Sequence, residues 1–461
     1  PLSIRRQRQM CIRDSPIPRE LIAPSYSDGE LISRLYLENA YLKSLRPAFN
    51  VGDGAELPDR ESLEDDVRYA FVRQFLRETE DAVPPRHLIV ANEYPSKPKR
   101  YANGFIHRRV KYYQAKGVQV DVVAFGKRVQ KDVYDYDGVK VLAGYGNELA
   151  GLLAAREYES ISVHFMNSEM WKVLKDNIPH STTLLVYVHG YEARNWSRLP
   201  YGIKDSQYLN ARIERSLRNE DVWREINSTG EAHFVFVSDW WRRAAMDDLN
   251  QVFDSENSAV IHNFVDTDLF SYEEKNQDQR FKILWVRSAH SHSYGADIAA
   301  DFLRRLRGTD VWSDLDICIV GDGQFFGEFD AFADDPVVTI RREFIGQEEI
   351  TALHKNYGFF LVPTRFDTQG VSRDEAMSSG LIPITCPVTA VPEFTDEKSS
   401  VLFNEGDAQA AVSKYLEILD DPAQFTEMSR AAADRIRKQN GALQTVEKEL
   451  ALMKKQGGAL A

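Results

Sequence analysis

The sequence has little cysteine and no long hydrophobic run. Its three cysteines are Cys11, Cys318 and Cys386, and they share no spacing typical of a metal site. Two of them lie in or beside predicted strands, which favours buried free thiols in a reducing compartment. No apolar run approaches the roughly 18 residues that a membrane span needs. We therefore expect a cytoplasmic protein; peripheral association with the inner face of the cell membrane stays open, although no strongly basic amphipathic helix indicates it.

Positive charge is also in short supply. The chain has 57 Lys and Arg against 70 Asp and Glu, a formal net charge of −13, which argues against a nucleic-acid-binding protein. Hydrophobic residues at 43% and charged residues at 28% are typical of a soluble globular protein. A length of 461 residues allows two or three domains with sizeable cores.

Short β-rich runs alternate with helical stretches over most of the chain, which predicts two α/β domains with parallel sheets. Strands of the first domain are expected at 87–91, 118–125, 160–165, 183–189, 233–238 and 259–262. Strands of the second are expected at 281–286, 315–320, 337–340, 359–362 and 381–384. The polar run 271–280 is typical of a linker, and helices are expected at 408–419, 424–439 and 442–455.

The N-terminal region has a different character. Residues 1–15 resemble translated sequencing-adapter read-through, with a basic disordered tail as the alternative, and we exclude them from fold reasoning. Residues 16–86 are acidic and mostly helical in pattern, with Val67, Phe71 and Phe75 four apart. We interpret them as a helical extension or as the remainder of a truncated upstream domain.

The stretch 358–394 organises the rest of the chain. It predicts a buried strand, a polar loop, a helix from about Val371 to Ser379 with Gly380 as its cap, and a second strand. Its loop lies at the carboxyl end of a strand, where open α/β sheets bind ligands. Polar and small residues fill this loop and the helix start: Arg365, Asp367, Gly370, Ser372, Arg373 and Glu375.

Asp367 and Glu375 are eight residues apart, one before the helix and one inside it, so both can face one cleft and accept hydrogen bonds from sugar hydroxyls. Gly370 lets backbone N–H groups approach an anion closely, and the following helix N-terminus favours negative charge. The alternative is an ordinary capped surface helix.

This stretch resembles the signature of retaining glycosyltransferases of family 4, which have the GT-B fold. Asp367 and Glu375 resemble the family's Glu-x7-Glu motif, with Asp in the first place, and EAMSSGLIPIT and Pro392-Glu393-Phe394 resemble its later segments. The resemblance implies that Glu375 holds the nucleotide ribose, that Asp367 contacts the donor sugar, and that loop amides near Gly370 and Val371 face the sugar and diphosphate.

The resemblance also implies a domain plan. Two Rossmann-like domains face a cleft: residues 87–265 form an acceptor domain and residues 279–425 a donor domain. The N-terminal helical extension, 16–86, precedes them, and terminal helices at 426–461 return to the first domain. VIHNFVDTDLF at 260–270 resembles the family's segment at the domain junction.

One departure from the family concerns the leaving diphosphate. Relatives carry an arginine after the first donor-domain strand and a lysine a few residues on, and the two neutralise the diphosphate. Arg287 matches the arginine, whereas the lysine position is Ser293. Losing one such contact typically costs roughly 2.7–4 kcal/mol of transition-state stabilisation. Arg365, Arg373 or a protonated His290 or His292 are then candidates to supply the charge, and we favour an arginine.

On the acceptor side the resemblance covers fewer residues. Gly104 matches a glycine that opens a helix beside the acceptor and donor phosphates, although the family's common double glycine is absent. His189, which closes a predicted strand before Gly190, resembles a family "H-G" near the transferred sugar, with Glu192 as a companion; a structural histidine is the alternative. The basic run 97–111 fits an anionic acceptor, a lipid headgroup or simply a solvated helix face.

Two other patterns point elsewhere. Asp135-Tyr136-Asp137 matches the Asp-x-Asp metal motif of GT-A enzymes, but Gly138 and a short strand follow it, so we favour a turn and expect no metal. Gly321-Asp322-Gly323 after a strand is a weak dinucleotide signal that alone supports an oxidoreductase; Gly321 also resembles the family's glycine turn beneath the nucleotide.

The sequence thus predicts a metal-independent hexosyltransferase with no cofactor. It would move a sugar, with retention, from a UDP- or GDP-linked donor to a glycan, lipid-linked or other acceptor, in surface polysaccharide synthesis. Catalytic roles fall to Arg287, His189 and Asp367. The alternative is a degenerate GT-B module that binds a nucleotide or glycan without turnover, as the Ser293 departure suggests.

Overall fold

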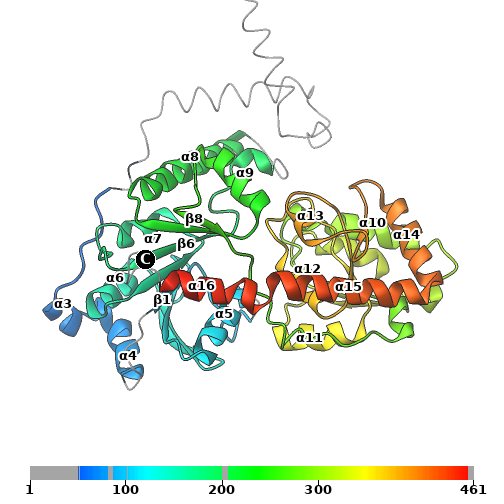
Figure 1. Cartoon of the computed structure of the whole chain (residues 1–461), viewed down its shortest axis with the longest axis horizontal. Helices are drawn as coiled ribbons and strands as arrows, with labels where there is room; N and C mark the ends of the chain where they lie inside the picture. Colours follow the sequence, from blue (N-terminus) through cyan, green and yellow to red (C-terminus); the bar gives the residue numbers. More distant parts are fainter. Residues whose placement is uncertain (1–49, 51, 81–86, 101, 200–205, 455–461) are drawn as a thin grey trace, which may run out of the picture.

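The computed structural model describes residues 50, 52–80, 87–100, 102–199 and 206–454. Two α/β domains lie side by side along the long axis of the molecule, the N-terminal domain on the left and the C-terminal domain on the right in Figure 1. Each domain is built on its own sheet, of eight and six strands respectively. This is the GT-B arrangement that the sequence predicts.

The C-terminal sheet is entirely parallel, with strand order β11-β10-β9-β12-β13-β14. Its strands are β9 Lys282–Val286, β10 Asp316–Val320, β11 Val338–Arg341, β12 Phe359–Leu361, β13 Ile382–Thr385 and β14 Val401–Leu402. The order reverses between β9 and β12. Ligands of open α/β sheets bind outside the carboxyl ends of the strands at such a reversal, so the loops after β9 and β12 mark the place for a site.

Helices cover both faces of this sheet. Alternate residues of β9 point to opposite faces: Ile283 and Trp285 pack against α10 and α14, and Leu284 and Val286 against α11, α12 and part of α15. The bounds are α10 Ala296–Leu306, α11 Gln347–Asn356, α12 Val371–Ser378, α13 Val391–Phe394, α14 Ala408–Asp420 and α15 Pro422–Asn440. The predicted helix is confirmed as Val371–Ser378, but its C-cap is Ser379 and not Gly380, which follows the cap at φ +85°.

The N-terminal sheet has the order β3-β4-β2-β1-β5-β6-β7-β8, parallel except for β3. Its strands are β1 His87–Ala91, β2 Val120–Phe125, β3 Asp132–Tyr136, β4 Val139–Gly144, β5 Ser160–His164, β6 Thr183–Val188, β7 Ala232–Phe236 and β8 Ser258–Val260. The edge strand β3 was not predicted. Asp137 and Gly138 form the turn to β4, where the Gly138 N–H donates to Asp135 Oδ1 at 3.1 Å, as the turn interpretation requires.

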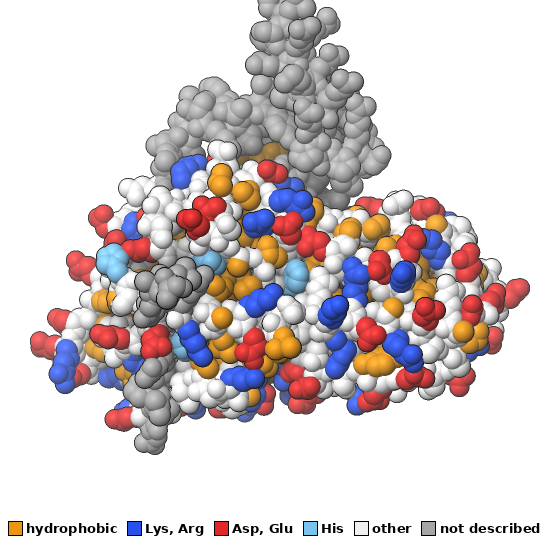
Figure 2. All heavy atoms as spheres, viewed as in Figure 1, with side chains coloured by type: hydrophobic (Ala, Val, Ile, Leu, Met, Phe, Trp, Pro, Cys, Tyr) orange, Lys and Arg blue, Asp and Glu red, His pale blue; other side chains and the backbone are white. Residues whose placement is uncertain are grey.

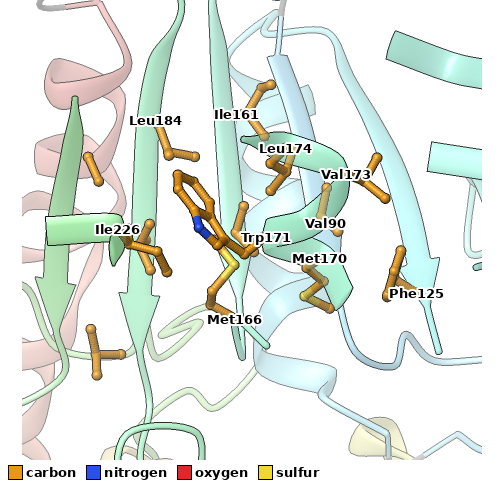
Figure 3. Close-up of a cluster of buried hydrophobic side chains, with 14 of the residues drawn as sticks. Val90, Phe125, Ile161, Met166, Met170, Trp171, Val173, Leu174, Leu184 and Ile226 are labelled. Atoms are coloured by element: carbon orange, nitrogen blue, oxygen red, sulfur yellow. The ribbon is translucent and has the colours of Figure 1, made fainter. Parts of the chain in front are cut away.

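One face of this sheet carries α5 and α16, and the other carries α4, α6, α7, α8 and α9. Figure 3 shows the larger core, in which Trp171 of α7 lies among side chains from the strands, including Leu184. The bounds are α3 Arg60–Asp65, α4 Ala70–Glu78, α5 Gly104–Ala115, α6 Gly146–Ala155, α7 Ser168–Leu174, α8 Ser206–Ser228, α9 Asp239–Leu249 and α16 Val446–Met453. Part of the predicted helical extension is thus visible as α3 and α4, and Val72 and Phe75 join the core; residues 1–49 lie outside the described residues.

The C-terminal end of the chain connects the two domains. Helix α15 packs on α12 of the C-terminal domain, and α16 then lies over the N-terminal domain against α5 (Figure 1). A fully buried ion pair anchors it there: Arg109 Nε lies 3.0 Å from Glu449 Oε1, and the Tyr113 hydroxyl also donates to Glu449. Removing one member of such a pair leaves the other charge buried and without a partner, which is costly, so this contact fixes α16 on α5.

Surface features agree with the composition. On the face shown in Figure 2, acidic and basic side chains are interspersed over the C-terminal domain rather than gathered by sign. Cys318 and Cys386 are buried free thiols, as predicted, while Cys11 lies outside the described residues. Within the described ranges, no helix combines the length and the apolar character needed to span a membrane.

Candidate active site

An arginine and an aspartate meet where the C-terminal sheet reverses its order. Arg287 follows β9, Asp367 lies in the loop after β12, and Arg287 Nη2 is 3.3 Å from Asp367 Oδ2. Arg287 is 5% exposed and its guanidinium carbon lies 4.9 Å from the centre of the Tyr294 ring. Its Nη1 is buried and has no hydrogen-bond partner among the described residues. A buried donor without a partner is costly, so this N–H is suited to a ligand oxygen.

The two glycines of the turn after β10 support the loop that carries Arg287. A Cβ on Gly321 would overlap the carbonyl of Arg287, and one on Gly323 would overlap the backbone of Ala289. The backbone of Arg287 also donates to the Val320 carbonyl at 3.1 Å. Gly321, predicted to bind the donor, thus packs against the backbone that positions Arg287.

Helix α12 begins at the same loop. Gly370, its N-cap, has φ +102°, a conformation that favours glycine, and a Cβ there would lie 2.9 Å from Arg373 Nη1. Val371 and Ser372 are the first helical residues, and N–H groups in a first turn lack intrahelical partners. Together with the helix dipole, they make this end of α12 suited to an anion.

Arg373 supports this loop from inside. It is 2% exposed and donates to the Asp374 carboxylate at 2.6 Å and to the Gln369 carbonyl at 2.5 Å. Asp374 in turn accepts from Gln369 Nε2 at 3.0 Å and Asn440 Nδ2 at 2.8 Å. The side chain of Arg373 is therefore engaged within the C-terminal domain.

Arg365 is engaged as well. Its two Nη atoms each lie 2.7 Å from an oxygen of Asp297, and its Nε lies 2.5 Å from Glu405 Oε1. The sequence favours an arginine, Arg365 or Arg373, as the cation that replaces the missing lysine. This geometry argues against both, because each guanidinium is already balanced by carboxylates of the same domain.

Ser293, at the lysine position, has a structural place. It lies in the 3-10 turn His292–Tyr294, where its carbonyl accepts from Thr364 Oγ1 at 2.7 Å and from the Arg365 N–H at 3.0 Å. These bonds join the loops after β9 and β12. Ser293 is buried and carries no charge, so it does not replace the positive charge of a lysine at this position.

Glu375 of α12 contacts a residue that the sequence analysis missed. Gln347, at the start of α11, donates to Glu375 Oε1 at 3.2 Å and accepts from Arg108 Nε of α5 at 2.7 Å. Burial raises the pKa of Glu375 to about 8, and the nearby Asp374 carboxylate adds to the rise. A Cβ on Gly104 would lie 3.0 Å from the Gln347 side chain, so this glycine makes room for the contact between the two domains.

His189 closes β6 in an aromatic setting. Its Nε2 lies 2.9 Å from His164 Nδ1, and its ring centre is 5.3 Å from that of Phe105 and 4.5 Å from that of Phe165. Burial, with the charge of Arg109, holds the pKa of His189 well below its usual range, so the imidazole is neutral. Its Nδ1 is buried and has no partner within the described part of the chain.

Glu192 positions the turn that carries His189. Its buried carboxylate accepts from the backbone N–H groups of His189 and Gly190, the latter at 3.0 Å. Burial raises the pKa of Glu192 to about 7, although these N–H groups favour the ionised form. The carboxylate of Glu192, predicted to lie on the acceptor side, is thus occupied by the backbone of the loop that carries His189.

The two halves of the site touch directly. Thr368, next to Asp367, donates through Oγ1 to the His189 carbonyl at 2.5 Å, and its own carbonyl accepts from Ser238 Oγ at 2.7 Å. These contacts bring the predicted residues of both domains to one interface. Across the ranges that the structure describes, no three His, Cys, Asp or Glu side chains converge as a metal site would require.

Comparison with known families and sequences points to sugar transfer. Residues 280–421, the bulk of the C-terminal domain, match the family model described as glycosyl transferases group 1. A stretch of 99 residues is 35% identical to a glycogen synthase of Thermodesulfovibrio yellowstonii, and it spans 20% of this chain and 20% of that relative.

Solved structures extend the likeness to the whole fold. A sucrose-phosphate synthase of Thermosynechococcus elongatus superposes with a TM-score of 0.62 at 14% identity, covering 80% of this chain and 98% of its own. The G117R mutant of S. aureus TarM, solved with Fondaparinux, alpha-GlcNAc-glycerol and UDP, gives a TM-score of 0.55 at 12% identity, covering 80% of this chain and 100% of its own. Anabaena HepE, solved with UDP and glucose, gives 0.55 at 13% identity over 79% and 98%. These likenesses establish the GT-B fold.

Proposed function

We propose that this chain, a GT-B protein whose C-terminal domain belongs to the group 1 glycosyl transferases, moves a hexose from a UDP-linked donor to an acceptor. The donor would bind at the C-terminal domain and the acceptor at the N-terminal domain, with the reaction between them. UDP is favoured over GDP because two of the structures with the same fold contain UDP.

The observation that carries this proposal is Nη1 of Arg287, which has no partner among the described residues and belongs to a guanidinium that contacts Asp367 in the loop leading to α12. Cleavage of a nucleotide-sugar places negative charge on the departing diphosphate. A buried guanidinium and the N–H groups of Val371 and Ser372 are preorganised to stabilise that charge, which is worth more in a site that excludes water. Asp367 orients Arg287 through their ion pair. Because it lies beside this guanidinium, Asp367 would also contact the donor sugar that is attached to the diphosphate.

The remaining residues take positional roles. Glu375 would accept hydrogen bonds from the ribose hydroxyls after Gln347 is displaced. The neutral His189 would lie beside the transferred sugar, where its Nδ1 can bond a hydroxyl. We further propose retention of configuration, attack on the face from which the diphosphate leaves, no requirement for a metal ion, and a role in making surface glycans.

Calorimetric titration of UDP, UDP-glucose and GDP-mannose, with and without EDTA, tests the proposal. We expect one nucleotide class to bind equally with and without EDTA, and Arg287→Ala to cut turnover of its sugar donor by roughly 10²- to 10³-fold. Arg305→Ala, which removes an exposed arginine paired with Asp301, is the matched control and should change nothing. Failure of the wild type to bind any nucleotide would refute the proposal.

A second candidate is a GT-B module that binds its nucleotide without turnover. Two observations favour it: Ser293 in place of the lysine, and Gln347 bonded to the carboxylate meant for the ribose. Wild-type protein that binds a UDP-sugar tightly, yet releases no UDP with or without a panel of sugar acceptors, would support this candidate over the enzyme.

A further inference from the structure

An arginine of the N-terminal domain lies against the C-terminal domain and has no ion-pair partner among the described residues. Arg194 lies in the loop after β6, five residues beyond His189, and is partly buried. Its guanidinium carbon is 5.0 Å from the centre of the ring of Phe366, the neighbour of Asp367. Its side chain forms no hydrogen bond or ion pair with any residue in the described ranges. Arg365 and Arg373, in contrast, are both bonded to carboxylates.

Two more arginines, from α8, act electrostatically on Arg194. Burial, followed by the charges of Arg212 and Arg215, lowers the pKa of Arg194 to about 10. Arg212 donates to the carbonyls of Leu199 and Trp196, at 2.5 and 3.4 Å, and Arg215 is exposed. Three guanidinium groups thus raise the local positive charge in a protein whose net charge is −13.

Two acids that act on the Arg194 charge are already engaged with other groups. The Glu192 carboxylate accepts from the His189 and Gly190 N–H groups, and Asp248 lies 2.6 Å from Arg198 Nε. Both carboxylates lower the energy of the Arg194 charge only from a distance, without contact. A partly buried guanidinium is only partly hydrated, and a ligand anion would supply a bonded partner.

We propose that Arg194, with Arg212 and Arg215, binds an anionic group of the acceptor, a phosphate or carboxylate, at the N-terminal side of the reaction centre. The fork of a guanidinium suits either group. The assignment of this anionic group to the acceptor rests on the proposed function. In the proposed function, Arg287 and the start of α12, both in the C-terminal domain, bind the donor diphosphate. Arg194, Arg212 and Arg215 are therefore available to bind the second substrate.

The test uses protein saturated with UDP, so that the diphosphate site is filled. Glucose 6-phosphate, inorganic phosphate and glucose are then titrated calorimetrically into the wild type and into Arg194→Ala, Arg194→Lys and Arg224→Ala. Arg224 lies on α8, the helix of Arg212 and Arg215, and pairs with Glu220 and Asp221, so its variant is a control for loss of one arginine. Thermal unfolding confirms that each variant is folded.

We expect the wild type to bind glucose 6-phosphate at least about tenfold more tightly than glucose, since hydrogen bonds to charged groups are stronger than those between neutral groups. Arg194→Ala should remove this preference, Arg194→Lys should keep part of it, and Arg224→Ala should keep all of it. UDP should bind equally to the wild type and Arg194→Ala.

Three results would overturn the inference: no preference for the phosphate compounds in the wild type, equal affinities in Arg194→Ala, or a loss of UDP affinity in Arg194→Ala. The last would assign the arginine to the donor diphosphate. Wild-type protein that binds inorganic phosphate but no nucleotide would instead refute the proposed function and leave the anion site standing.

Discussion

The arginines on the two sides of the interface between the domains differ in their ion pairing. On the donor side, Arg365 and Arg373 are held by carboxylates of their own domain, and Arg287 shares Asp367. On the opposite side, Arg194 and the exposed Arg215 form no ion pair among the described residues. The comparison suggests that the donor half relies on a rigid loop, one partly balanced cation and a helix N-terminus. The acceptor half keeps positive charge available.

The largest expected effect is on the support of the donor loop. Arg373→Ala leaves the buried Asp374 without its guanidinium partner, which typically costs about 3–5 kcal/mol of stability. The same change frees the loop around Gly370, so turnover should fall as well. Urea unfolding measures the first effect and UDP release the second.

The matched control is Arg430→Ala. Arg430 is exposed and pairs with the exposed Glu274, so its loss should cost about 1 kcal/mol or less. If the two variants lost equal stability, the claim that the buried Arg373 stabilises the fold more than the exposed Arg430 would be wrong. If Arg373→Ala were stable but inactive, Arg373 would act on the donor itself.

A smaller effect is expected from the turn on the acceptor side. Glu192→Ala leaves the buried N–H groups of His189 and Gly190 without their acceptor, which costs roughly 1–3 kcal/mol. His189 should then be less well placed, lowering kcat more than donor affinity. Glu192→Gln keeps an acceptor oxygen and should recover much of the loss; equal defects in the two variants would indicate a role for the charge rather than for position.

Short-range patterns in the sequence predicted much of this molecule. The strands β1, β9 and β12 and the helix α12 lie where the apolar runs and Gly370 indicate, because burial and helix ends leave local signals. The strand β3 was not predicted. Its sequence, DVYDY, is mostly polar because β3 lies at the edge of the sheet, where it pairs with β4 and is only partly buried, so it lacks the buried apolar run that marks the other strands. A partly buried edge strand can be specified by its turn alone.

The partners of the site residues were out of reach for a physical reason. Gln347 is 28 residues before Glu375, and Asp297 is 68 residues before Arg365, so no local spacing links them. Their contacts depend on how α10 and α11 pack on the sheet. The sequence could place an arginine in the donor loop, but only the folded chain shows which arginines are already paired.

The smallest effect concerns one proton at Glu375. With a pKa of about 8, this carboxyl is mostly protonated at pH 7 in the free protein. Ribose hydroxyls that donate to the carboxylate favour the ionised form, so binding lowers the pKa and releases a proton. At pH 9 the group is already ionised, so the release should shrink and UDP affinity should rise between pH 7 and 9.

Calorimetry of UDP binding at pH 7, in buffers with different ionisation enthalpies, counts the protons released. Glu375→Gln removes the titrating group but keeps its size, so the difference between the two proteins isolates Glu375 from the ionisation of the nucleotide. We expect the wild type to release a large fraction of one proton more than the variant. Equal proton counts would mean that Gln347 stays on Glu375 in the complex, and that the ribose is held by other groups.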